Sequence, residues 1–425
     1  MLASNQLVLR IEVECQSMTK YGRSPWVDTF PKSRVPSYPR QRGPLSTSVV
    51  IVGGGLTGCA AAYAFAANGV DVVLVEADQV GRGSTGLASG WIGGDPGVSF
   101  IEVEKALGRA AARDAFRSWR RAALDFGALI RRLDIKSAFQ PQGTAIVALT
   151  PDQAARLARD RKARRDAGVD APLLSARAVK GELGLDAAAA IRENAGGIVD
   201  PYRTCLGLAA AAVARGAKMF ERTPVRKITF DRRRAGVITT GGAIRAERVV
   251  VATGVPTALC KSLIRHFWFR TTYLAMTERV PAKVRQQLGR RQAVVRDWSE
   301  PPHVVRWVDD ERLLVAGADA PSPPVRQRDR MAVQRTGQLM YELSTLYPDI
   351  SGILPEYGWD AHYARTSDGL PYIGPHRNFP HQLFAFGDSS RSITGAYLAS
   401  RMLLRHHLDE LESADRHFGF TRHGG

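Results

Sequence analysis

The strongest hydrophobic pattern in the chain lies near residue 50. Residues 49–52 read Val-Val-Ile-Val, and such an uninterrupted β-branched run predicts a strand that is buried on both faces. Gly53, Gly55 and Gly58 follow at G-x-G-x-x-G spacing. The alanine-rich stretch 59–68 then predicts a helix, which ends where a glycine lets the chain turn.

A second apolar strand is predicted at residues 72–75, and it leads directly into Glu76. Strand, glycine turn, helix, strand and acid together predict a dinucleotide-binding βαβ unit. Gly53 permits the tight turn, Gly55 admits a pyrophosphate close to the backbone, and Gly58 lets helix and strand pack closely. The helix N-terminus attracts phosphates, and Glu76 can accept hydrogen bonds from ribose hydroxyls. We expect cofactor contacts in this unit from Gly53, Gly55, Leu56, Thr57, Gly58, Glu76 and Ala77.

Farther along the chain the hydrophobic pattern changes from helical to strand-like. Residues 101–133 and 151–186 predict helices. Residues 265–320 carry runs with apolar residues at every second position, which predicts antiparallel strands of a second sheet. Residues 325–347 predict another helix, and residues 359–363 the last strand of that sheet.

Small residues dominate the loop that follows Glu76. Residues 81–90 read Gly-Arg-Gly-Ser-Thr-Gly-Leu-Ala-Ser-Gly, and such a loop can wind close to a large flat ligand and donate backbone N–H groups to it. With this loop the chain resembles the D-amino-acid oxidase (DAO) family of FAD-dependent oxidoreductases, which includes glycine oxidase and sarcosine oxidase. The resemblance implies FAD rather than NAD as cofactor. It also implies cofactor contacts from Gly83, Ser84, Thr85, Leu87, Ala88, Ser89 and Gly90.

Three later segments carry the same resemblance. Residues 196–228 look like the family's return to the FAD domain, residues 249–254 like its strand and turn beside the cofactor, and residues 368–399 like its C-terminal flavin cover. The resemblance implies further cofactor contacts from Val225, Ala252, Thr253, Gly254, Gly374, Gly387, Asp388, Arg391, Ser392, Ile393 and Thr394.

The resemblance implies an α/β (α+β) fold. We expect a Rossmann-like FAD-binding domain with a GR2-type βαβ fold, and an antiparallel-sheet substrate domain inserted into it. The expected segments are an extended N-terminal arm (1–46), three parts of the FAD-binding domain (47–98, 195–262 and 364–412), a helical segment that begins the substrate domain (99–194), its antiparallel sheet (263–363) and a C-terminal tail (413–425).

In this family the flavin lies between the FAD domain and the face of the antiparallel sheet. It takes a hydride from a carbon next to an amine, so the protein supplies binding, orientation and desolvation. The resemblance therefore implies oxidation of an amine or amino acid to an imine that hydrolyses, with oxygen or another electron acceptor as partner. Our substrate-facing candidates are Tyr273, Arg306, His362, Tyr363 and Arg365.

The sequence departs from the family at the position expected to hold a substrate carboxylate. Amino-acid-oxidising members usually place an arginine five residues before the aspartate of the D-G-x-P-x-I-G motif, and Tyr363 stands there in this chain. Arg365 lies two residues closer to Asp368 and faces the same side if the strand is regular. This pattern is more similar to amine-type members of the family such as γ-glutamylputrescine oxidoreductases.

Cysteine usage bears on the cofactor and on metals. Sarcosine oxidase-like members attach FAD through a cysteine late in the chain, but no cysteine follows Cys260 here, so we expect non-covalent FAD. The four cysteines are scattered without metal-ligand spacing, which predicts no metal site and is typical of a reducing cytoplasm.

Composition adds one unusual property, a formal net charge of +18 over 425 residues. Nucleic-acid motifs do not accompany the arginines, so we expect no specific nucleic-acid partner. The N-terminus lacks a signal-peptide pattern and no apolar stretch predicts a transmembrane helix, which favours a cytoplasmic protein. Two alternatives stay open, a flavin-dependent RNA- or cofactor-modifying enzyme, and a non-catalytic flavoprotein.

Overall fold

The first of two large sheets is mostly parallel and carries the glycine motif. The computed structural model describes residues 18–390 and 392–423. The sheet has the order β10–β3–β2–β13–β12–β11, and β20, which also pairs with β19, lies beside β13. Its strands are β2 (Leu45–Val52), β3 (Val72–Val75), β10 (Lys218–Phe220), β11 (Val225–Phe230), β12 (Ala235–Thr239), β13 (Ala243–Gly254), β19 (Tyr372–His376) and β20 (Phe379–Phe386).

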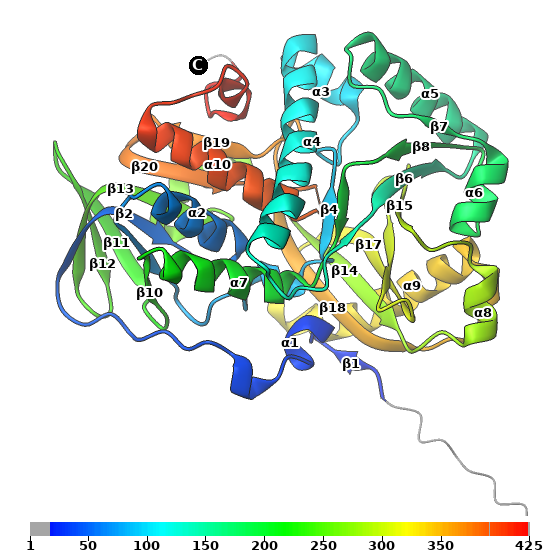
Figure 1. Cartoon of the computed structure of the whole chain (residues 1–425), viewed down its shortest axis with the longest axis horizontal. Helices are drawn as coiled ribbons and strands as arrows, with labels where there is room; N and C mark the ends of the chain where they lie inside the picture. Colours follow the sequence, from blue (N-terminus) through cyan, green and yellow to red (C-terminus); the bar gives the residue numbers. More distant parts are fainter. Residues whose placement is uncertain (1–17, 391, 424–425) are drawn as a thin grey trace, which may run out of the picture.

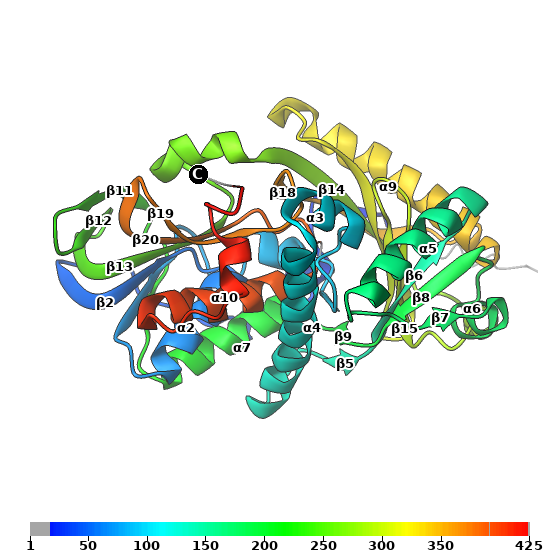
Figure 2. The ribbon, with the colours of Figure 1, turned by 90° about the horizontal axis from the view of Figure 1, so that it is seen from above.

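Strand β2 is apolar throughout its second half because both of its faces are covered. Val49 and Ile51 pack on the side of helices α2 (Leu56–Ala67), α7 (Pro201–Ala214) and α10 (Thr394–Leu408), whereas Val50 and Val52 point to the opposite side. Figure 1 and Figure 2 show these three helices together over one face of the sheet.

The second sheet has nine strands in the order β1–β18–β14–β17–β16–β15–β6–β8–β7. Its pairs are antiparallel except β1–β18 and β15–β6, which are parallel. The strands are β1 (Lys20–Tyr21), β6 (Gly143–Ala148), β7 (Leu173–Leu174), β8 (Ala189–Glu193), β14 (Trp268–Thr277), β15 (Ala293–Asp297), β16 (Val304–Val308), β17 (Arg312–Pro321) and β18 (Pro355–Arg365). A small third sheet, β4 (Trp91–Gly93), β9 (Gly196–Ile198) and β5 (Gln140–Pro141), lies between the two large ones.

The two faces of the second sheet have different neighbours, as the alternation along β14 shows. Tyr273 packs with residues of helix α9 (Arg328–Leu346), whereas Leu274 belongs to the cluster that contains α2 and α7. The Leu274 face is therefore the one that turns toward the parallel sheet. This arrangement confirms the predicted combination of a parallel nucleotide-binding sheet with an antiparallel second sheet.

Two long predicted helices are divided in the structure. Residues 101–133 form α3 (Phe100–Leu107) and α4 (Arg109–Arg132), because Gly108 between them adopts a φ of +87°. Residues 151–186 form α5 (Pro151–Asp166), β7 and α6 (Ala176–Leu183), since Gly168 adopts a φ of +73° after α5. A further short helix, α8 (Ala282–Gln287), lies among the predicted strands.

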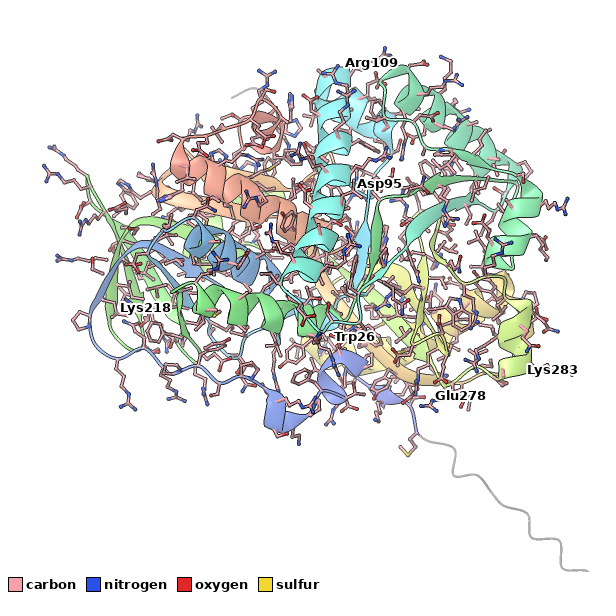
Figure 3. The ribbon with its side chains drawn as sticks, in the orientation of Figure 1. Trp26, Asp95, Arg109, Lys218, Glu278 and Lys283 are labelled. Atoms are coloured by element: carbon pink, nitrogen blue, oxygen red, sulfur yellow. The ribbon has the colours of Figure 1, made fainter. Side chains whose placement is uncertain are left out.

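Part of the N-terminal arm lies along the second sheet. Strand β1 pairs with β18, and helix α1 (Pro25–Asp28) carries the buried Trp26, which Figure 3 labels. In the part of the chain that the structure describes, no helix is both long and apolar enough to cross a membrane.

Candidate active site

The glycine turn after β2 holds the backbone where only glycine fits. Gly53 has a φ of +110°, and a Cβ there would lie 2.7 Å from the carbonyl oxygen of Ala252. A Cβ at Gly58 would collide with the carbonyl oxygen of Gly53, so this glycine lets α2 pack against β2. Gly55 differs, because a Cβ there would meet only the hydroxyl of Thr85, at 3.2 Å. The space beside Gly55 is therefore open toward a ligand.

Glu76 organises the neighbouring backbone at the end of β3. Its Oε2 accepts from the Gly54 N–H at 2.6 Å and its Oε1 from the Asp78 N–H at 2.9 Å. The Thr223 N–H donates to the Glu76 carbonyl oxygen at 2.8 Å, which brings the start of β11, with Val225, beside this end of the site. Ala77 follows in the same turn.

Side chains from distant segments hold four consecutive carbonyl oxygens of residues 84–90, called the 84–90 loop below. Without these donors the carbonyl oxygens could turn into the space that the loop presents to a ligand. Each carbonyl shares a planar peptide group with an N–H, so holding the carbonyl oxygens also fixes the directions of the loop's N–H groups. The donors are Ser24 to the carbonyl of Gly86, Trp359 to Leu87 at 2.9 Å, Trp26 to Ala88 at 2.8 Å and Arg306 to Ser89 at 2.6 Å. At the loop's start, Thr85 accepts from the Leu56 N–H at 2.8 Å.

A cavity of about 200 Å³ lies between the ends of β13 and β20 and the inner face of β14 and β18. Many predicted cofactor residues border it. They are Thr57, Ser84, Leu87, Ala88, Ser89, Gly254, Gly387, Asp388, Ser392 and Ile393. The structure thus brings the 84–90 loop, the β13 turn and the C-terminal segment to one place.

Other predicted cofactor residues support this cavity without lining it. Ala252 packs against Gly53, and Thr253 follows in β13. Gly374 faces the His406 ring of α10, Thr394 donates to the Gly93 carbonyl at 2.8 Å, and Gly90 lies against Val199. Gly83 precedes the short 3₁₀ turn Ser84–Leu87. Arg391 lies outside the residues that the structure describes.

A partly buried acid, Asp388, precedes α10 where the N-terminus of the helix meets the cavity. Burial raises the pKa of Asp388, although hydrogen bonds from the N–H and hydroxyl of Ser390 oppose the shift. A Cβ at Gly395 would collide with the Asp388 carboxylate, so this acid lies directly at the start of the helix. Helix N–H groups and an acid of raised pKa can both stabilise negative charge that develops on a bound ligand.

The five predicted substrate residues separate into two groups. Tyr363 borders the cavity and also a second, larger one of about 540 Å³, which Arg365 lines as well. The Tyr363 hydroxyl donates to Asp319. His362 also borders the first cavity, but its Nδ1 lies 2.8 Å from Thr271 Oγ1 on the strand face that carries Tyr273.

Tyr273 and Arg306 lie away from both cavities. Tyr273 packs against α9, with the Arg335 guanidinium 5.9 Å from its ring centroid. Arg306 is buried, where desolvation lowers its pKa to about 10, and it binds the carbonyl oxygens of Ser89 and Val199. Instead of contacting substrate, Arg306 is placed to hold the 84–90 loop.

Several residues of the site were not predicted from the sequence. Thr272, Leu274, Ala361 and Ile373 line the cavity as ordinary strand residues, and only the period-two pattern could have placed them on the inner face. Trp359, beside that face, was expected only as a strand residue, and its hydrogen bond to the loop has no local sequence signal.

The residues at this cavity fit an FAD. The glycine turn leaves space at Gly55 for a pyrophosphate, and Glu76 stands at the end of β3 for a ribose. The mostly apolar cavity joins this turn to the face of the second sheet. The fold and this site define an FAD-dependent oxidoreductase. The chain belongs to the DAO family, because the family model described as "FAD dependent oxidoreductase" matches residues 48–405.

Curated relatives extend over most of the chain. The γ-glutamylputrescine oxidoreductase of Escherichia coli (strain K12) is 26% identical over 363 residues, which cover 84% of this chain and 83% of the relative. The glycine oxidase of Bacillus licheniformis is 25% identical over 370 residues, covering 83% and 92%.

Solved structures share the fold. The crystal structure of glycine oxidase from Geobacillus kaustophilus superposes with a TM-score of 0.74 at 24% identity and covers 90% of this chain and 100% of its own. L-amino acid deaminase from Proteus myxofaciens gives a TM-score of 0.72 at 17% identity, covering 95% and 99%. The chain therefore shares the fold of these two enzymes.

Proposed function

We propose that the protein oxidises the C–N bond of a small amine or amino acid that bears an anionic group. The observation that carries this proposal is the junction of the two cavities at Tyr363, with Arg365 lining the outer one. A substrate that enters from the arginine-lined side reaches the first cavity with its anionic end still held outside. The names of the relatives, which act on γ-glutamylputrescine and glycine, support amine chemistry.

Bound FAD would supply the hydride acceptor. The chain's own residues bind, orient and shield the reacting group. Leu274, Ala361 and Ile373 form an apolar wall that excludes water. Tyr363, whose hydroxyl is fixed by Asp319, borders the passage between the cavities and limits how the amine can enter. An anionic group beside Arg365 leaves the amine end pointing inward.

Non-covalent attachment of FAD is part of the proposal. Among the described residues, Cys59, Cys205 and Cys260 are buried and none of them lines the cavity. A thiol that reached the flavin ring would have to border that space. Denatured protein should therefore release its FAD into the supernatant, and flavin that precipitates with the protein would contradict this part.

Anaerobic flavin reduction tests the proposal most directly. The purified holoprotein is mixed with a panel of neutral amines, N-methyl amino acids, D-amino acids and ω-amino acids, and bleaching of the flavin band is followed. We expect bleaching by anionic amines and weaker bleaching by neutral amines of the same length. If no amine reduces the flavin while dithionite does, the C–N oxidation is wrong and a non-catalytic flavoprotein is favoured.

A further inference from the structure

The second cavity is larger than the space a simple amino acid needs. It has a volume of about 540 Å³ and adjoins the first cavity at Tyr363. Its walls come from α5, from residues 97–102, from the segment 298–302 after β15, and from β14 and β18. A substrate that fills both cavities must extend well beyond its reacting carbon.

Four arginines in this wall lack an acidic partner among the residues that the structure describes. In the described part of the chain, Arg156, Arg159, Arg270 and Arg365 form no ion pair, whereas Arg296 in the same wall pairs with Asp95. Gathering like charges in a hollow is unfavourable without a counter-ion, and a concave wall concentrates their field. The arrangement is therefore suited to an anionic ligand.

The acids of the same cavity do not cancel these charges. Asp297 accepts from His303, and Asp319 accepts from Tyr363. Glu102 and Glu300 are exposed, and Asp319 keeps its negative charge because a tyrosine hydroxyl does not neutralise it. Apart from Asp297, which is paired with His303, three carboxylates therefore face four arginines. The net charge of these cavity-lining side chains is therefore positive.

The four arginines form an inner and an outer pair. Arg270 lies directly across from Tyr363 in the β14–β18 register, and Arg365 follows Tyr363 by two residues on the same strand face. Arg156 and Arg159 are three residues apart on α5, which places them on one side of that helix. The inner pair is thus next to the passage, and the outer pair belongs to the opposite wall.

A buried charge network fixes the helix that carries the outer pair. Asp160 of α5 accepts from the Ser99 hydroxyl at 2.8 Å and from Arg164 at 2.8 Å. Arg164 and Arg296 both reach the buried Asp95, labelled near the centre of Figure 3. Because α5 is held against α3 and β15 in this way, Arg156 and Arg159 start from a fixed backbone, which lowers the cost of ordering them around a ligand.

We propose that Arg156 and Arg159 form a distal subsite for a second oxyanion of the substrate. The substrate would then be an amine with one anionic group near the inner pair and another, a carboxylate or a phosphonate, at its far end. Naming this as a substrate subsite rests on the proposed amine oxidation. The recognition itself rests on the unpaired arginines and the cavity.

Binding of non-oxidisable anions tests the subsite without catalysis. Calorimetric titrations of the FAD-loaded protein at low ionic strength would compare butyrate, glutarate and 4-phosphonobutyrate. A second charge held by two arginines should make both dianions bind about tenfold or more tightly than butyrate. Tighter binding of either dianion supports the subsite, and the ratio between the two dianions identifies the preferred oxyanion.

Two double variants separate the subsite from the overall charge of the protein. In Arg156→Gln/Arg159→Gln, the preference for the tighter-binding dianion over butyrate should fall below about twofold. The control Arg232→Gln/Arg233→Gln removes the same charge from the exposed turn between β11 and β12, at the other end of the molecule, and should keep the preference.

Equal affinity of the unaltered protein for butyrate and for both dianions would overturn the subsite. A preference that survives in Arg156→Gln/Arg159→Gln would also overturn it. Neither of these results depends on turnover. A failure of the amine oxidation gives a different result, because dianions would then bind selectively while no amine bleaches the flavin. Bleaching by amines without any selective binding of dianions would contradict the subsite but not the amine oxidation.

Discussion

The indole N–H of Trp26 donates to the carbonyl oxygen of Ala88 at 2.8 Å, which makes the N-terminal arm part of the candidate active site. The guanidinium of Arg306 lies 5.0 Å from the centre of the Trp26 ring and donates to the next carbonyl, that of Ser89. One aromatic side chain and one buried cation thus brace neighbouring peptide groups of the same loop. The arm has a structural task in holding this loop.

The first prediction concerns this brace. Trp26→Phe keeps the aromatic packing but leaves the Ala88 carbonyl without its donor, so the loop loses part of its fixed direction. A lost hydrogen bond to a buried carbonyl costs about 1–3 kcal/mol, so FAD should bind about tenfold more weakly. Fluorescence titration of apoprotein with FAD measures this. Tyr341→Phe, an exposed ring on α9, is the control, and an unchanged Kd in Trp26→Phe would show that the arm does not support the flavin loop.

The second prediction separates two glycines of one motif. An alanine at Gly55 meets only the Thr85 hydroxyl, at 3.2 Å, and enters the space for the pyrophosphate, whereas an alanine at Gly58 collides with the Gly53 carbonyl oxygen. Gly55→Ala should therefore lose FAD while the thermal midpoint of the apoprotein stays nearly constant. Gly58→Ala should lower that midpoint by several degrees, since one or two kcal/mol shifts it by roughly that amount. Normal FAD content in Gly55→Ala would place the phosphates elsewhere.

Local pattern was enough to predict the parallel sheet and its glycine turn. The β-branched run of β2, the glycine spacing and the small-residue loop each have a periodic or compositional signal that does not depend on distant contacts. The antiparallel second sheet followed from period-two runs for the same reason. The predicted helix 101–133 failed at Gly108, because a single glycine can either continue a helix or turn the chain.

Contacts between residues far apart in the chain explain the features that could not be predicted from the sequence. Arg306 lies in an alternating strand and resembles a substrate residue in sequence, yet it is bonded to Ser89 and Val199 far away in the chain. Arg164 looks like one of many helical surface arginines, yet its side chain is 1% exposed and pairs with Asp160 and Asp95. Such partners become neighbours only once the sheets have formed, so no window of sequence contains the information.

A third prediction tests Arg365 as the holder of an anionic group. Arg365→Met should raise KM for anionic amines about tenfold, since the charge-assisted pair is lost at a partly exposed site. KM for neutral amines of the same length should change little, and Arg365→Lys should restore part of the difference. Steady-state kinetics with matched substrates measures both. An equal loss for charged and neutral amines would make Arg365 a structural residue.

A fourth prediction concerns pH and His303. Burial alone would lower the pKa of His303, but hydrogen bonds and charges from Asp297 and Glu342 outweigh it and raise the pKa. The protonated ring therefore stabilises the folded protein below its ordinary pKa of about 6.5, and this contribution disappears as the pH rises through the raised value. The stability difference between the unaltered protein and His303→Gln should shrink as the pH rises above about 6.5.

Urea denaturation at several pH values measures this difference. Glu342→Gln removes one of the two acids that hold the imidazolium, so its own stability difference from His303→Gln should depend less on pH. A difference that stays constant over the whole range would show that His303 does not change its charge there.

An ion pair between Arg422 and Asp368 holds the C-terminal tail beside the site. Arg422 Nε and Nη2 lie 2.6 Å and 2.7 Å from the two Asp368 oxygens, and the side chains are 1% and 0% exposed. The guanidinium also binds the carbonyl oxygens of Leu370 and Pro371 and stacks on Tyr372, 3.7 Å from its centre. Because Pro371 lines the cavity proposed to hold the flavin, the tail helps to set the position of that wall.

Arg422→Met should therefore destabilise the protein and weaken FAD retention together. Removing one partner of a buried ion pair leaves the Asp368 carboxylate without its main compensation, which costs about 3–5 kcal/mol. Asp368→Asn in the same chain removes that stranded charge, so the double variant should recover part of the loss. Urea denaturation gives the free energies, and flavin fluorescence gives the retained FAD. Arg416→Met, in the same tail, is the control. A loss below about 1 kcal/mol in Arg422→Met would show that the tail is not held by this pair.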